Sequence, residues 1–125
     1  MSIKAVANEF VELSNQGRNF DVMEAMYAPD IVSVEANGEE FSGKRPVIEK
    51  SRRWGAENAV NGERVRGPYF DSAAGDRPSG QFAVHFAFDV TPKSTGRPVT
   101  LEEVGLYTVK DGQITREQFF YEGER

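Results

Sequence analysis

An alternation of apolar and polar side chains in the second half of the chain constrains its fold more than any other feature. Between Gln81 and Thr91 every second residue is apolar: Phe82, Val84, Phe86, Phe88 and Val90. This pattern is typical of a β-strand with one buried face. A strand of this length twists and curls, and its apolar face needs a layer of other elements to cover it.

The neighbouring segments predict further strands of the same sheet. Val99–Lys110 and Gln113–Tyr121 are predicted to form a hairpin, because Asp111-Gly112 between them is a turn dipeptide. Shorter strands are expected over Ile31–Ala36 and Glu63–Phe70. A Gly-Pro pair inside the second of these indicates a bulge or a sheet edge.

The first half of the chain has the apolar spacing of amphipathic helices. Ser2 and Asn19 are predicted N-caps, and Gly17 and Pro29 are predicted stops. The predicted helices cover residues 2–16, 19–28 and 44–59. Because helices come first and antiparallel strands follow, we predict an α+β fold, with a conical, curved antiparallel sheet wrapped around the N-terminal helices. The length predicts a single domain over residues 1–125.

The composition excludes several kinds of site and partner. A net charge of −5 argues against nucleic acid and against an anionic membrane as partners. Without cysteine the chain has neither disulfides nor thiolate sites, and with one histidine we predict no metal site. The chain lacks a signal-peptide pattern and an apolar run of the ~20 residues that a membrane span needs. We therefore expect a cytoplasmic globular domain.

The register of the final hairpin decides which side chains share a face. If the turn is bulged, Val109 pairs with Gln113 and one face gathers acids and aromatic residues. If the turn has two residues, Lys110 pairs with Gln113 instead, and Glu117 moves to the face opposite Tyr107. We favour the bulged turn because it gathers a coherent polar and aromatic face. That face consists of Glu103, Tyr107, Glu117, Phe119 and Tyr121.

Glu103 and Glu117 are the candidate catalytic acids of this face. A carboxyl group buried among aromatic rings has a raised pKa and can exchange protons near neutral pH. Tyr107 is a candidate donor to an oxyanion on the substrate, and Phe119 and Tyr121 are candidate ligand contacts. The alternative is that one acid is exposed and the other pairs with an arginine: Arg64, Arg66 or Arg116.

Three other side chains are candidate ligand contacts. Tyr27 and Trp54 are predicted on the helices that cover the sheet, where aromatic residues belong either to the core or to a wall for ligand stacking. His85 points outward, toward a dimer interface, if the apolar face of its strand is the core face. It lies opposite Glu103 instead if Pro98 pairs with the last valine of that strand.

Three segments of the chain resemble the nuclear-transport-factor-2-like superfamily in its SnoaL-like branch: ANEFVELSNQGRNFDVMEAMYAPDIV, GEEFSGKRPVIEK and EEVGLYTVKDGQITREQFFY. The resemblance covers nearly the whole chain. It implies a cystatin-like α+β barrel with a central pocket for a small apolar or aromatic ligand, and a homodimer formed through the outer face of the sheet. The apolar alternation of the last strands supplies candidate interface residues: Val104, Leu106 and Phe120.

The resemblance leaves the activity open, because the superfamily contains ketosteroid isomerases, dehydratases, epoxide hydrolases, cyclases and non-catalytic modules. The catalytic motifs of these enzymes do not match this chain residue by residue. Two hypotheses follow. The first is a cofactor-free isomerase, dehydratase or cyclase that uses a pocket carboxylate and a tyrosine. The second is a non-catalytic ligand-binding or interaction module. An enzyme should bury a carboxylate beside a second donor within reach of a substrate.

Overall fold

One sheet organises the chain, and three helices cover one of its faces. The computed structural model describes residues 1–123. Its helices are α1 (Ile3–Asn15), α2 (Asn19–Met26) and α3 (Lys44–Glu57), with a short 3-10 helix, η1 (Ser72–Ala74). Its strands are β1 (Tyr27–Val34), β2 (Glu40–Ser42), β3 (Asn58–Tyr69), β4 (Gly80–Pro92), β5 (Val99–Lys110) and β6 (Gln113–Phe120). Within residues 1–123, no helix is long and apolar enough to cross a membrane.

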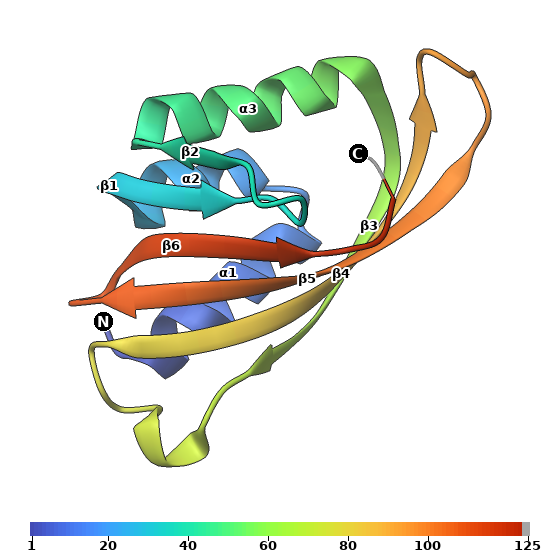
Figure 1. Cartoon of the computed structure of the whole chain (residues 1–125). Coiled ribbons are helices and arrows are strands. Elements are labelled where there is room, and N and C mark those ends of the chain that lie inside the picture. The colour runs from blue at the N-terminus through green and yellow to red at the C-terminus, as the bar shows by residue number, and fades with distance from the viewer. Residues whose placement is uncertain (124–125) are drawn as a thin grey trace.

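The sheet is curved and open. Its strand order is β2-β1-β6-β5-β4-β3, so β2 and β3 form its two edges and it does not close into a barrel. Neighbouring strands are antiparallel except β1 and β6, which run parallel. Figure 1 shows the sheet curling around the side where the helices lie. The predicted α+β class with a curved sheet is confirmed, and the parallel β1–β6 pair corrects the expectation of a wholly antiparallel sheet.

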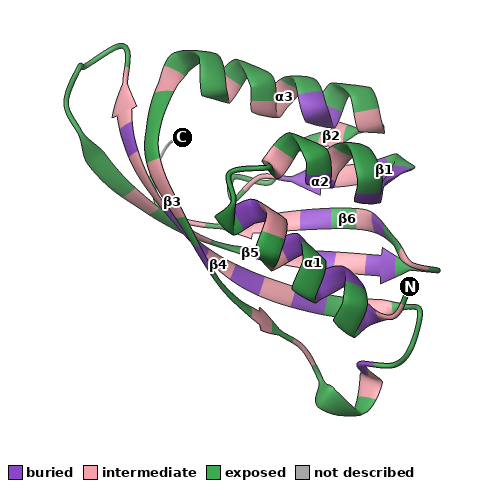
Figure 2. Ribbon diagram, turned by 180° about the vertical axis from the view of Figure 1, so that it is seen from behind, coloured by how far each residue is buried: buried purple, intermediate pink, exposed green. Residues whose placement is uncertain are grey.

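The core lies between α1 and the concave face of the sheet, which is the face that the helices cover. Figure 2 shows buried residues gathered where α1 meets the strands. The ring of Phe10 packs on Phe82 and Tyr107, with centroids 5.5 and 4.6 Å away. The buried apolar residues of α1 lie along the same side of the helix: Ile3, Val6, Ala7 and Phe10.

The helix starts follow the expected capping chemistry only in part. The Ser2 hydroxyl caps α1 by accepting a hydrogen bond from the Ala5 N–H at 3.1 Å, and Gly17 follows the helix with a φ of 75°. Asn19 does not cap α2. Arg18 holds the cap position, and the Asn19 side chain turns toward β3.

Helices α2 and α3 end earlier than predicted because strands begin at once after them. α2 ends at Met26, since Tyr27 already pairs with Ile114 of β6. Tyr27 therefore belongs to a strand, and its predicted place on a helix is wrong. α3 ends at Glu57, and Asn58 starts β3 without a connecting loop.

The final hairpin has the two-residue turn, so the favoured bulged turn is wrong. Asp111 and Gly112 have positive φ values of 50° and 79°, and Lys110 pairs with Gln113. Positive φ at both central residues matches the right-handed twist of the flanking strands. An Asp-Gly pair is compatible with both turns, so the dipeptide alone does not select between them.

A β-bulge in β6 restores the predicted face despite the different turn. Ile114 and Arg116 pair with consecutive residues of β5, so Thr115 between them is an extra residue. This extra residue returns Glu117 to the face of Tyr107 and places the two directly opposite each other. The predicted residues therefore share a face, although Tyr107 pairs with Glu117 and not, as the bulged turn would require, with Thr115.

Strand β4 turns its apolar face inward and His85 outward. Val90 pairs with Val99, and His85 pairs with Val104 of β5. The alternative register that would place His85 opposite Glu103 is therefore wrong.

Gly105 lies where core rings leave no room for a side chain. A Cβ there would lie 2.8 Å from Tyr107 Cε2 and 3.0 Å from Phe86 Cε2. Because both rings are packed in the core, Gly105→Ala should lower the free energy of unfolding by about 1–3 kcal/mol in urea denaturation. Gly55→Ala in α3 is the control: no atom lies within 4 Å of that Cβ position, and alanine should add about 0.5–1 kcal/mol. An unchanged urea midpoint for Gly105→Ala would contradict the close packing.

Candidate functional site

The concave face carries acidic side chains around one tyrosine, and we name this group the concave-face cluster. It consists of Glu63 from β3, Glu103 and Tyr107 from β5, and Glu117 and Phe119 from β6. The strand registers place all of them on the side of the sheet that faces the helices. Strand pairing thus gathers acids that lie far apart in the sequence.

Glu117 is the most buried acid of the cluster, with 2% of its surface exposed. The Tyr27 hydroxyl donates a hydrogen bond to Glu117 Oε1, and the Ser33 hydroxyl donates one to Oε2 at 2.6 Å. Burial raises the pKa of Glu117, although Lys50 and the two hydrogen bonds act in the opposite direction. Burial and the Glu117 charge raise the pKa of Tyr27 well above its usual value, so this phenol remains a donor.

Lys50 of α3 supplies the positive charge for this buried acid. Its Nζ lies 3.7 Å from Glu117 Oε2 and donates hydrogen bonds to Ser33 Oγ at 2.6 Å and to Glu35 Oε1 at 2.5 Å. The ammonium group also lies 5.2 Å from the ring centroids of two aromatic residues, Phe41 and Phe119. The sequence left open that an arginine pairs with one of the two candidate acids. In the structure a lysine of α3, Lys50, pairs with Glu117 instead.

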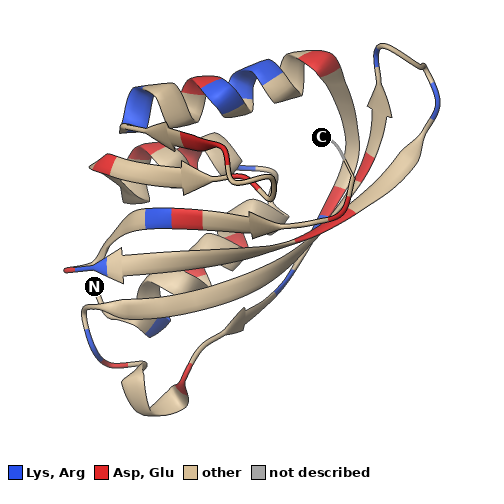
Figure 3. Ribbon diagram, in the orientation of Figure 1, with Lys and Arg blue, Asp and Glu red and all other residues tan. Residues whose placement is uncertain are grey.

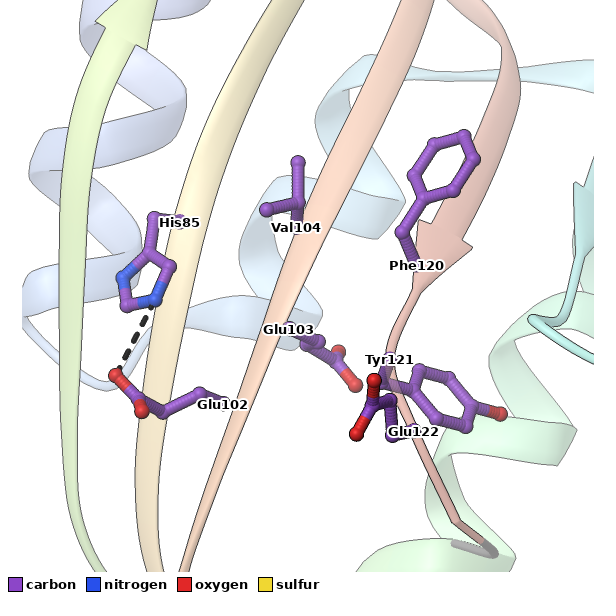
Figure 4. A pocket seen from close by; sticks show the side chains of 7 residues that line it. All are labelled: His85, Glu102, Glu103, Val104, Phe120, Tyr121 and Glu122. Carbon is purple, nitrogen blue, oxygen red and sulfur yellow. Dashed lines mark ion pairs between the residues drawn. The ribbon is translucent and has the colours of Figure 1, made fainter.

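Tyr121 and Glu103 lie at the open side of the cluster. The Tyr121 hydroxyl donates a hydrogen bond to Glu35 Oε2 at 2.7 Å. Burial, followed by this bond, raises the pKa of Tyr121 to about 12. Figure 4 shows Glu103 pointing toward Tyr121 and Glu122. These side chains border a shallow depression of about 330 Å³ that extends to His85 on the outer face of the sheet.

Tyr107 is the centre of the cluster. It is 1% exposed, and its ring packs 4.6 Å from Phe10 and 5.1 Å from Phe82. Burial raises the pKa of Tyr107 well above its usual value, and the charges of all three cluster carboxylates raise it further. The phenol therefore stays protonated and can donate a hydrogen bond, on a face that carries acids from three strands.

Glu63 is held by a single amide. The Asn19 Nδ2 donates to both carboxylate oxygens of Glu63 at 3.0 Å, while Asn19 Oδ1 is buried without a hydrogen-bond partner. Burial raises the pKa of Glu63 to about 7, against the smaller effect of the Asn19 hydrogen bond. A bulge at Asn61 turns Glu63 to the concave face, where it lies opposite Phe88.

A cleft of about 550 Å³ opens beside the cluster at the end of α3. Trp54 of α3 lines it, together with Val99 and Leu101 of β5. The Trp54 ring packs on Phe88 with centroids 5.8 Å apart, and Phe88 pairs with Glu63 on one side and with Leu101 on the other. One aromatic ring therefore separates the cleft from the nearest acid of the cluster.

The structure gathers most of the predicted site residues and separates two of them. Trp54 lies at the neighbouring cleft. His85 lies on the outer face, where its Nε2 is 3.3 Å from Glu102 Oε1 and its Nδ1 is buried without a partner. The other six lie in or against the concave-face cluster: Tyr27, Glu103, Tyr107, Glu117, Phe119 and Tyr121.

Sequence reasoning missed five polar residues of the site. Lys50 had a usable signal, because it follows the buried Val47 by one helical turn and therefore faces the sheet. Figure 3 shows basic residues repeated along α3, which makes Lys50 resemble part of a solvated face. The others depend on strand register and carry no local signal: Asn19, Ser33, Glu35 and Glu63.

Comparison with known proteins identifies the family. Residues 1–121 match the family model of the SnoaL-like domain. The chain is similar to a candidate SnoaL-like polyketide cyclase from Mesorhizobium loti whose crystal structure is known. The identity is 44% and the TM-score 0.87, over 97% of this chain and 100% of that one. No curated protein matches.

Two more distant crystal structures share the fold. A protein with a cystatin-like fold from Xanthomonas campestris has 14% identity and a TM-score of 0.73, over 98% of this chain and 92% of that one. A protein with a ketosteroid isomerase-like fold from Catenulispora acidiphila, in complex with trimethylamine, has 16% identity and a TM-score of 0.68, over 93% and 84%. The predicted resemblance is confirmed, and the chain belongs to the SnoaL-like domain family.

Proposed function

We propose that this protein is an acid–base enzyme, of the isomerase, dehydratase or cyclase kind, that acts on a small, flat, apolar substrate without a cofactor. One observation carries the proposal: Tyr107 is 1% exposed on the concave face, and carboxylates of three strands lie close enough for their charges to raise its pKa. A donor and a base beside an apolar wall are the parts needed to remove a proton from carbon and to stabilise the resulting oxyanion.

The roles divide by the partners that each group already has in the folded protein. Tyr107 donates to the oxyanion. Glu103 or Glu63, the two acids at the edges of the cluster, accepts the proton. Glu117 does not, because Tyr27, Ser33 and Lys50 already occupy its surroundings. Glu117 and its partners instead position the helix and strands of the site.

The family and fold favour this reaction class by analogy. The Mesorhizobium loti protein is described as a candidate polyketide cyclase, and the Catenulispora acidiphila protein has a ketosteroid isomerase-like fold. The first name denotes a cyclase, one of the reaction classes proposed here, and the second denotes the fold that the two chains share.

A non-catalytic binding module is the second candidate. The observation in its favour is that both carboxylate oxygens of Glu117 already accept hydrogen bonds from the protein, from the hydroxyls of Tyr27 and Ser33. In this case the concave face and the cleft at Trp54 hold a small apolar or aromatic ligand without chemistry.

Elimination of 5-nitrobenzisoxazole tests the enzymatic proposal. A carboxylate takes the C–H proton, the N–O bond breaks, and a coloured phenolate forms without any cofactor. The wild type should turn this probe over faster than acetate at equal concentration, and Tyr107→Phe should lower kcat/KM about 100–1000-fold, the usual effect of removing one oxyanion donor. Tyr69→Phe, which changes a tyrosine that is 58% exposed, is the matched control. A wild-type rate equal to that of acetate would favour the binding module.

Lys50→Met tests the positioning role of the Glu117 network. It leaves a buried carboxylate without its cation, so the free energy of unfolding should fall by about 3 kcal/mol at pH 7. Because Lys50 lowers the pKa of Glu117, the variant holds that acid protonated to higher pH, and its deficit should shrink as the pH falls. Arg53→Met, at an exposed position of α3, is the control for urea denaturation. Equal stability of both variants would contradict this role.

We further propose that the outer face of the sheet forms a homodimer. Val104 and Phe120 pair across β5 and β6 and are 39% and 49% exposed, which leaves two large apolar side chains adjacent in solvent. Sedimentation equilibrium at micromolar concentration should give twice 13.9 kDa, and Phe120→Glu should give 13.9 kDa. Phe20→Glu, at a residue of α2 that is 41% exposed, should leave the dimer intact. A wild-type species of 13.9 kDa would reject the interface.

A further inference from the structure

We propose that Glu63 is the proton acceptor of the reaction proposed above, and that Asn19 is its positioning residue. The inference rests on the proposed function and goes beyond it by choosing between the two acids at the edges of the cluster. It also defines the substrate as a carbon acid, with its acidic C–H beside an electron-withdrawing group.

The three acids of the cluster have different surroundings. Glu117 is enclosed by its own donors and a lysine. Glu103 borders an open depression beside Tyr121 and Glu122. Among residues 1–123, Glu63 has one hydrogen-bond partner, the Asn19 amide, and forms no ion pair. A carboxylate held by one neutral donor keeps lone pairs for an incoming proton.

The geometry around Glu63 suits proton transfer from carbon. Asn19 donates to both carboxylate oxygens, which fixes the plane of the carboxylate. Phe88 lies opposite Glu63 in β4, and the ring of Trp54 packs on Phe88 from α3. The cleft lies on the far side of the Phe88 ring, so a flat substrate that enters the cleft must pass this ring to place its C–H at the carboxylate. A carboxylate in such an apolar setting is a stronger base than in water.

Asn19 also offers a binding group. Its Oδ1 is buried and has no hydrogen-bond partner, although a buried acceptor normally has one. A substrate N–H or O–H near the acidic carbon would satisfy it. The proposed ligand therefore combines a flat apolar body, an acidic C–H and one hydrogen-bond donor.

The surroundings also determine how the activity depends on pH. Asn19 of α2 donates to Glu63, and Phe88 of β4 pairs with it. The other titratable groups of the cluster are Tyr107, which stays protonated because its pKa lies well above the usual value, and the acids Glu103 and Glu117, whose charges also act on Tyr107. Burial raises the pKa of Glu63 to about 7. A base must be ionised, so kcat/KM should rise with pH through about 7.

The decisive experiment measures 5-nitrobenzisoxazole elimination by two matched variants from pH 5 to pH 9. Glu63→Gln should lower kcat/KM at pH 8 by about 100-fold or more, the usual contribution of a general base. Glu9→Gln, at an exposed position of α1, is the matched control and should keep the wild-type rate within about 3-fold and the same midpoint, because it leaves the base in place. A Glu103→Gln variant that loses the activity while Glu63→Gln keeps it would overturn the assignment and leave the proposed function standing. No wild-type turnover would end both proposals.

Asn19→Ala tests the positioning role. The Asn19 hydrogen bond lowers the pKa of Glu63, so its loss should move the midpoint of the pH profile upward. A purely structural effect would lower the rate at all pH values and leave the midpoint unchanged, and that result would reject the role. Asn15→Ala on α1 is a comparison variant, because its amide bonds the β3 backbone at Val65 and not the acid.

A stability measurement gives a readout that needs no substrate. The folded pKa of Glu63 lies above the unfolded value of 4.5, so the folded state binds the proton more tightly. The stabilising effect of that proton is complete below pH 4.5 and is lost as the pH rises through about 7. The urea midpoint of the wild type should therefore fall relative to Glu63→Gln across this window. A constant difference between the two proteins would show that Glu63 is not desolvated and would overturn the proposal.

Discussion

The buried carboxylate of Glu117 links the side chains of three elements, in addition to the ladder that already pairs β1 with β6. Tyr27 and Ser33 come from β1, Lys50 from α3 and Glu117 from β6. Removing a carboxylate from water is costly unless donors replace the solvent. The donors come from β1 and α3, and the acceptor comes from β6. The network therefore forms completely only when β1 lies parallel to β6 and α3 lies over both strands. The network therefore fixes how α3 lies against this part of the concave face.

The sequence predicted the class of fold and the composition of one face, but not how that face arises. Alternation identifies β4 and the last hairpin, and the predicted group of Glu103, Tyr107 and Glu117 shares a face in the structure. The turn was nevertheless wrong, and the bulge at Thr115 compensated for it. The shorter turn and the bulge each shift strand β6 by one residue, so together they return the same side chains to the same face. Side-chain alternation therefore cannot distinguish the two registers.

The residues that sequence reasoning missed are those whose role depends on partners distant in the chain. In the sequence, Lys50 resembles the other basic residues of α3, which are expected to be solvated. Only the structure shows that the buried carboxylate of Glu117 lies beside it. Asn19 looks like a helix cap, because asparagine before an amphipathic segment usually is one. In the structure its amide serves Glu63, which lies 44 residues away in the sequence. The local sequence shows which residues could take part in a site. Contacts between segments that are distant in the sequence decide which of them do.

Two bulges explain why strands β3 and β6 present acids inward. Strand β3 gains an extra residue at Asn61, and strand β6 gains one at Thr115. In each strand the acid lies two residues after the bulge: Glu63 and Glu117. Without the bulge, the alternation of a regular strand would turn each acid to the outer face and a neighbouring arginine, Arg64 or Arg116, toward the helices. The inward positions of Glu63 and Glu117 therefore depend on backbone irregularity. A bulge disrupts strand pairing locally, and proteins use bulges where they orient a particular side chain. For this reason we regard Glu63 and Glu117 as parts of a site.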